Sequence, residues 1–199
     1  MRTASNKPAA SSPDGRVQRG QRSKKAIVTA LFELIGEGVY EPTADQVAER
    51  AAVGIRSVFR HFSDMDGLYA AMDARLEEAN APFVLAPVPK GTLHRRARAF
   101  VERRATLYEQ IAPYKRAANA KRAHSEVLQD LHVSLVRRLA KDLRRWFPEL
   151  AKAKPEVVHA LELATSFEAW DRLRVEQRLG KQRATAAMQC TVTALFQSL

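Results

Sequence analysis

Apolar residues recur every three or four positions along almost the whole chain, and this spacing is the strongest constraint on its fold. From Ser23 onward, for example, Ile27, Leu31 and Leu34 would lie on one face of a helix. No segment shows the strict alternation of a half-buried strand. The sequence therefore predicts an all-α protein, and 199 residues with 46% hydrophobic content are enough to bury a substantial core.

Glycine and proline residues divide this helical pattern into shorter units. Gly38 is expected to end the first helix in a left-handed conformation, and Pro82 to end a helix that begins after Asp64. The predicted division is a basic flexible arm (1–21), a small helical unit (22–64), a connecting helix with a proline-rich seam (65–91) and a larger helical body (92–199). Within the body, helices are predicted over 92–111, 113–122, 126–147, 157–179 and 184–195.

Positive charge is concentrated at two places in the chain. Residues 1–25 carry seven Lys or Arg and one acidic residue, and residues 92–147 carry fourteen Lys or Arg and five acidic residues. The segment between them, 26–91, has more acidic than basic residues, so the net charge of +11 is unevenly distributed. An excess of this size favours a polyanionic partner such as nucleic acid.

The most specific local pattern lies at residues 43–62. Thr43 and Gln46 have the spacing of a capping box, which begins a short helix directly after Pro42. Gly54 is expected to allow a tight turn, and a second short helix follows it. Two short helices joined in this way form a helix-turn-helix, in which the second helix enters the major groove of DNA.

The second short helix is expected to turn Val58 and Phe62 inward and to expose Ile55, Arg56, Ser57, Arg60 and His61. Arg56 is the candidate for reading a base, because an arginine can donate two hydrogen bonds to guanine. Ile55 is a candidate for contact with a thymine methyl group. The other three exposed residues are candidates for phosphate contacts, which set the register on DNA without reading its sequence.

Residues 43–62, with the sequence TADQVAERAAVGIRSVFRHF, resemble the signature of the tetracycline-repressor (TetR) family, and the similarity extends over about residues 22–72. The resemblance implies that Thr43, Gly54 and Phe59 also belong to the DNA-binding surface. Three positions depart from the family pattern. Members usually have Tyr where Phe59 stands, often Ser or Thr where Gly54 stands, and commonly Lys where Met65 stands. Each of the usual side chains would help to bind phosphate.

The resemblance implies a homodimer that binds a palindromic operator in double-stranded DNA, with half-sites in successive major grooves. It also implies that the body binds an unknown small-molecule effector, which releases the protein from its operator, as in a repressor. Aromatic residues of the body are candidates to line the effector pocket, with ordinary core packing as the alternative: Phe100, Tyr108, Phe167 and Trp170. The arginines within residues 95–104 fit either an anionic effector or a solvated basic face.

Other classes of protein have little support in the sequence. Glu156 and His159 have the spacing of one half of a di-iron motif, but no second copy exists, so no metal, cofactor or enzymatic activity is expected. The single Cys190 excludes an internal disulfide, and no apolar run approaches the roughly 20 residues of a membrane span, so a cytoplasmic protein is expected. The remaining alternative is a helical interaction module that binds nucleic acid nonspecifically or anionic lipid through its basic faces.

Overall fold

The structure of the protein is a computed structural model that describes residues 13–198, and over that range every regular element is helical. The all-α prediction is therefore confirmed. The α-helices are α1 (Pro13–Gly36), α2 (Ala44–Arg50), α3 (Ile55–His61), α4 (Met65–Val84), α5 (Leu93–Arg122), α6 (Glu126–Trp146), α7 (Pro155–Ala164), α8 (Phe167–Asp171) and α9 (Lys181–Phe196). A 3-10 segment, η1 (Pro148–Lys152), follows α6, and a π-helical turn, η2 (Arg172–Glu176), follows α8.

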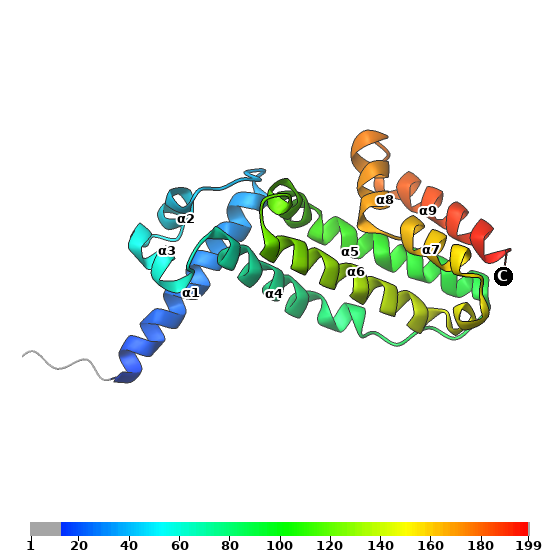
Figure 1. The fold of residues 1–199 in the computed structure, drawn as a ribbon, viewed down its shortest axis with the longest axis horizontal. Coiled ribbons are helices and arrows are strands. Elements are labelled where there is room, and N and C mark those ends of the chain that lie inside the picture. The colour runs from blue at the N-terminus through cyan, green and yellow to red at the C-terminus, as the bar shows by residue number, and fades with distance from the viewer. Residues whose placement is uncertain (1–12, 199) are drawn as a thin grey trace, which may run out of the picture.

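The helices form two regions of an elongated molecule. Helices α1, α2 and α3 form a small unit at one end, and α5 to α9 form a larger body at the other (Figure 1). Helix α4 leaves the small unit and runs along the body beside α6. A structural change in the body therefore has a direct route to the small unit through α4.

Each region has its own hydrophobic core. In the small unit, Ile27, Leu31 and Val58 are almost completely buried. The same cluster includes Ala117 from the end of α5 and Leu128 from the start of α6, so the body contributes side chains to the core of the small unit. The core of the body is dominated by large aromatic side chains from several helices: Phe100, Tyr108, Trp146, Phe147, Phe167 and Trp170.

Several predicted helix boundaries are confirmed by local geometry. The backbone N–H of Thr43 donates to Gln46 Oε1 at 2.8 Å, and Gln46 N–H donates to Thr43 Oγ1 at 3.2 Å, which completes the predicted capping box of α2. Asp64 caps α4 by accepting from the N–H of Gly67 at 2.8 Å. Gly38 has a φ of +95° directly after α1, as expected for a left-handed helix stop.

The prediction of a flexible arm over residues 1–21 is wrong for its second half. Residues 13–21 belong to α1, which begins at Pro13 rather than near Ser23. Proline suits the first position of a helix, and extending a helix that is already anchored by packing costs much less than nucleating one. Residues 13–21 can therefore be helical without an apolar face of their own. The rest of the predicted arm lies outside the described residues.

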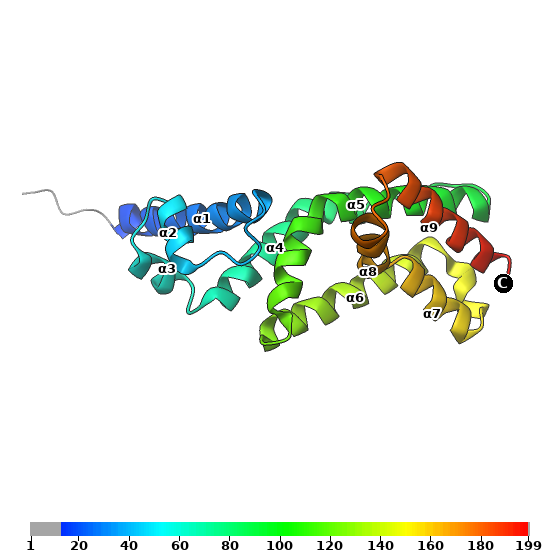
Figure 2. The same cartoon turned by 90° about the horizontal axis from the view of Figure 1, so that it is seen from above.

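Two prolines that were predicted to interrupt helices lie inside them instead. Pro82 is within the last turn of α4, where one lost hydrogen bond has little effect on a helix that ends two residues later. Pro113 lies within α5, which was predicted as two helices. The helix continues because Ile111 and Ala117, on either side of the proline, are both buried. Figure 2 shows α5 bending along its length, as expected for a proline kink.

The helix predicted over 157–179 is broken in the structure. Helix α7 ends at Ala164, and Ser166 starts α8 by accepting a hydrogen bond from the N–H of Ala169 at 3.1 Å. The π-helical turn η2 then follows directly. The apolar spacing continues across these breaks because Phe167 and Trp170 are both buried in the core of the body, so periodicity alone did not reveal the interruptions.

Candidate functional site

In the turn that joins α2 to α3, the residue with a left-handed backbone is not the glycine that was predicted. Ala52 adopts a left-handed conformation with φ of 51°, whereas Gly54, predicted to supply the tight turn, has φ of −71° and extended backbone. Gly54 is the N-cap of α3 and makes no side-chain hydrogen bond. A Cβ atom built on Gly54 would meet nothing within 4 Å, so the serine or threonine common in the TetR family would fit here.

Helix α3 has one buried and one exposed face, as predicted. Val58 and Phe62 are 1% and 6% exposed and pack in the core of the small unit. Ile55 and Phe59 are 36% and 48% exposed, and the side chain of Arg56 is also exposed. Exposing a large apolar side chain to water is unfavourable, so the presence of two such side chains on this face favours a contact surface. The start of α3 thus presents Ile55 and Arg56 together.

The three predicted phosphate contacts lie in different environments. Arg60 is exposed, and its guanidinium donates to Ser57 Oγ at 3.2 Å, so these two side chains form one polar group on the outer side of α3. His61 is only partly exposed and lies against α1, with its Cε1 3.9 Å from the position of a Cβ on Gly20. Burial, Arg60 and Lys24 lower the pKa of His61, which favours the neutral imidazole. His61 is therefore less suited to phosphate binding than predicted.

Helix α2 is held in place by contacts that the local sequence pattern does not reveal. The guanidinium of Arg50 donates two hydrogen bonds, of 2.8 and 2.7 Å, to the carboxylate of Glu37 after α1. The hydrogen bond from Arg50 lowers the pKa of Glu37. Thr43, predicted to be part of the DNA-binding surface, already uses its hydroxyl as the N-cap of α2. Met65, where lysine is common in the family, packs against the core of the small unit.

The four aromatic residues predicted to line an effector pocket are core residues. Phe100, Tyr108 and Trp170 are 0% exposed, and Phe167 is 2% exposed. The Tyr108 hydroxyl donates to the carbonyl of Thr165 at 2.6 Å, and the Trp170 indole donates to Glu109 at 3.1 Å. These polar atoms are satisfied within the protein, and none of the four residues lines either cavity described below. All four side chains therefore pack in the core of the body, which was the alternative to lining a pocket.

A large cavity lies elsewhere in the body, between α4, α5 and α6. It has a volume of about 470 Å³, within the usual range of small-molecule sites. Half of the sixteen residues that line it are aliphatic, and the others are polar or charged; the aliphatic ones are Leu76, Ala81, Val84, Leu85, Leu107, Ile111, Leu135 and Leu139. Sequence reasoning missed this site because aliphatic residues on three helices have the same spacing whether they pack against each other or surround a space.

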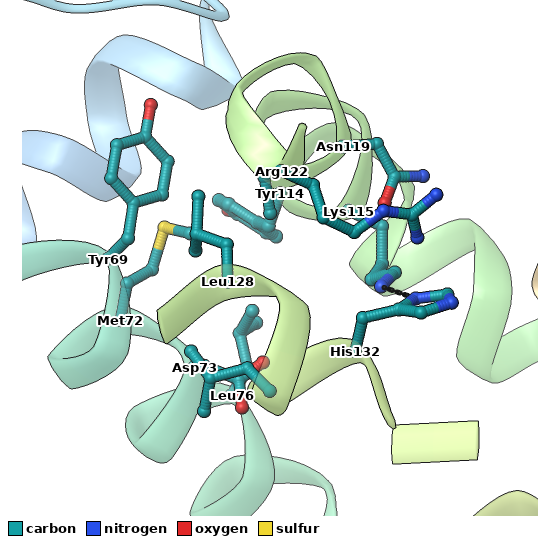
Figure 3. Close-up of a pocket in the computed structure, with 12 residues that line it drawn as sticks. Tyr69, Met72, Asp73, Leu76, Tyr114, Lys115, Asn119, Arg122, Leu128 and His132 are labelled. Atoms are coloured by element: carbon teal, nitrogen blue, oxygen red, sulfur yellow. Dashed lines mark hydrogen bonds between the residues drawn. The ribbon is translucent and has the colours of Figure 1, made fainter. Parts of the chain in front are cut away.

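A small polar hollow adjoins the large cavity where the body meets the small unit (Figure 3). Its volume is about 20 Å³, enough for a water-sized group. Lys115, Asn119, Arg122 and His132 gather on one side of it, and Tyr69 and Met72 lie on the other. Lys115, Asp73 and Leu76 line both the hollow and the large cavity, so the two spaces share one wall.

Three arginines surround one buried carboxylate at the other end of the large cavity. Arg104 and Arg145 donate to Asp142 at 3.2 and 2.9 Å, and Arg103 also donates to it. The side chains of Asp142, Arg103 and Arg104 are only 6%, 10% and 1% exposed. Burial is the main factor that lowers the pKa of Arg103. Asp142 therefore holds this end of the body together electrostatically.

None of the described helices combines the length and the apolar content needed to cross a membrane. The described residues also contain no group of three or more potential metal ligands among His, Cys, Asp and Glu.

An exposed arginine at the start of the second helix of a helix-turn-helix, joined to an all-helical body, is an arrangement found in helix-turn-helix DNA-binding proteins. Residues 27–72 match the sequence model described as bacterial regulatory proteins, tetR family. The match covers most of the small unit and the start of α4, so the similarity to this family is established for that part of the chain.

Solved structures support the same fold over nearly the whole chain. A transcriptional regulator from Rhodococcus sp. Rha1 is similar with a TM-score of 0.66 at 19% identity, covering 89% of this chain and 96% of that one. A protein from Mesorhizobium loti assigned to the TetR family has a TM-score of 0.54 at 16% identity, covering 91% and 96% of the two chains. A search of curated protein sequences finds no match.

Proposed function

We propose that this protein is a homodimeric, cytoplasmic repressor that leaves a palindromic operator when a small molecule binds in its helical body. The observation that carries the proposal is the exposure of Ile55 and Arg56 at the start of α3, while Val58 and Phe62 fix the helix on the small unit. In this proposal each part of the chain has one role. The small unit reads DNA, α4 connects, and the body over 92–199 binds the effector and the second copy.

Arg56 is proposed to read a base and Arg60 to bind phosphate. Arg56 is exposed and takes part in none of the hydrogen bonds found among the described residues, so its guanidinium can reach a guanine edge. Arg60 is tied to Ser57 at 3.2 Å, an arrangement suited to a backbone contact that does not depend on sequence. Exposed basic residues of α1, Arg19, Arg22 and Lys25, add positive charge to the same unit.

The dimer is proposed to form through the outer faces of α7 and α9. These two helices pack against each other, and α9 exposes Ala186, Cys190 and Ala194 at four-residue spacing. Small side chains let a second helix approach closely, and Leu163 on α7 is 70% exposed. Ala194→Arg should therefore yield monomers in analytical ultracentrifugation, whereas Ser134→Arg, on the exposed face of α6, should leave the dimer intact. The same oligomeric state for both variants would contradict this interface.

Effector control is proposed to act through α4, because α4 lines the large cavity and also starts in the small unit. The contacts between the two regions support this route. Ser125 Oγ, at the start of α6, donates to Asp66 on α4 at 2.6 Å. The hydroxyl of Tyr69 on α4 donates to the carbonyl of Tyr40 at 3.3 Å. A ligand that moves α4 would therefore change the position of both α3 helices in the dimer.

The test is selection of bound sequences from a randomised duplex library by the purified protein at a stated salt concentration. Recovery of a palindrome is the expected result. Arg56→Ala should then relax base preference at one position of each half-site, and Arg60→Ala should weaken binding to all sequences and reduce its salt dependence. Binding with no preferred sequence, or equal effects of the two variants on every sequence, would refute the assignment.

A further inference from the structure

Part of the lining of the small hollow consists of buried polar atoms with one hydrogen-bond partner or none. Lys115 is 8% exposed, and its Nζ has a single hydrogen-bond contact, with His132 Nδ1 at 3.2 Å. Arg122 Nη1 and Asn119 Oδ1 are also buried, and neither has a hydrogen-bond partner among the described residues. Buried donors without partners cost free energy, so a native structure normally satisfies them.

The two cationic donors among these groups, Lys115 Nζ and Arg122 Nη1, favour a negatively charged ligand, whereas Asn119 Oδ1 is an acceptor. Among the described residues, no carboxylate lies within ion-pair distance of Lys115. Burial is the main factor that lowers the pKa of Lys115 and that raises the pKa of Asp73, the acidic residue in the same hollow. Glu168 and Asp73 are the acidic residues whose charges act on Lys115 and oppose this lowering of its pKa. The hollow thus brings together two basic side chains, Lys115 and Arg122, and neither has an ion pair with a carboxylate among the described residues.

The large cavity beside the hollow would hold a different, apolar part of the ligand. Aliphatic side chains such as Leu107, Ile111 and Leu139 line it beside charged residues of α6, and it is about three times the size of a cavity that binds benzene, which is about 150 Å³. Because Lys115 and Leu76 line both spaces, one molecule can occupy the apolar cavity and still reach the hollow.

We propose that the effector is an amphipathic carboxylic acid, with its hydrocarbon part in the large cavity and its carboxylate at the wall that the two spaces share, where one carboxylate oxygen enters the hollow toward Lys115 and Arg122. This inference rests on the proposed function, because it names the ligand class of the site that controls DNA binding. The carboxylate would accept hydrogen bonds from Lys115 Nζ and Arg122 Nη1, and these charge-assisted bonds are the strong ones. The hydrocarbon would gain affinity by leaving water.

The test compares three probes of equal chain length on the full-length protein by isothermal titration calorimetry without DNA: decanoate, decanol and decylamine. Decanoate is expected to bind at least tenfold more tightly than the other two. Lys115→Met should reduce decanoate affinity at least tenfold and leave decanol affinity unchanged. Lys152→Met is the matched control, because Lys152 is exposed and lines neither space, and it should keep the preference for decanoate.

The outcomes separate this proposal from the proposed function. Equal binding of decanoate and decanol by the unmodified protein, or tighter binding of decylamine, would overturn the ligand class even if Lys115→Met failed to fold. Preferred binding of decanoate supports the ligand class, and a separate assay with the selected operator then tests release. If decanoate binds with this preference but the operator stays bound, the ligand class stands and the role of the ligand as an effector fails.

Discussion

Asp142 provides the sharpest test of how the body is held together. Its buried carboxylate accepts hydrogen bonds from Arg103, Arg104 and Arg145. Asp142→Asn keeps the shape and one acceptor oxygen but removes the negative charge. The buried cations of Arg103 and Arg104 then lose the charge that compensates their burial, and breaking a buried ion pair in this way costs about 3–5 kcal/mol.

Glu102→Gln is the matched control, since it also replaces a carboxylate by an amide. The side chains of Glu102 and its partner Arg98 are 52% and 71% exposed, and exposed pairs of this kind contribute about 0–1 kcal/mol. For a chain of this size, about 1 kcal/mol shifts the melting temperature by about 2–4 °C. Asp142→Asn should therefore lower it by about 6–20 °C, and Glu102→Gln by less than about 4 °C.

The assay is chemical and thermal unfolding followed by circular dichroism, at one protein concentration for all variants, because the stability of a dimer depends on concentration. A loss of stability for Asp142→Asn no larger than that for Glu102→Gln would refute the reasoning. That result would mean that the buried carboxylate of Asp142 contributes no more to the free energy of unfolding than an exposed carboxylate does.

Other features of the structure lead to three further predictions. Gly38→Ala should destabilise the protein by about 1 kcal/mol in urea unfolding, because φ of +95° disfavours any Cβ although the space around it is open; an unchanged midpoint would contradict this. Phe59→Tyr should tighten operator binding by about two- to tenfold in a mobility-shift titration, through one added hydrogen bond to phosphate, and weaker binding would argue against an interface at this face. Burial, Lys115 and Arg122 lower the pKa of His132 below 6.5, so its contribution to stability is present above pH 6.5 and lost as the pH falls through the lowered value. Unfolding curves at pH 7.5 and 5.5 should therefore differ less for His132→Gln than for the unmodified protein.

The helix-turn-helix could be predicted from the sequence because its signals are local. Thr43 and Gln46 cap α2 across three residues, and Gly38 stops α1 through its own backbone conformation. The inward positions of α3 follow from helical spacing, so the burial of Val58 and Phe62 was also predictable. Of the side chains predicted to be exposed, Ile55, Arg56 and Arg60 are exposed, whereas Ser57 and His61 are only partly exposed.

The structure decided what depends on packing between distant segments. Pro113 stays inside α5 because buried residues on both sides hold the helix together, and no local rule supplies that free energy. The same is true of the ligand site. Aliphatic spacing on α4, α5 and α6 cannot distinguish a packed core from a cavity of about 470 Å³, and Lys115 meets His132 from seventeen residues away. Sequence fixes which faces of the helices are apolar, whereas the tertiary arrangement determines where those faces leave a space and which buried charges line it.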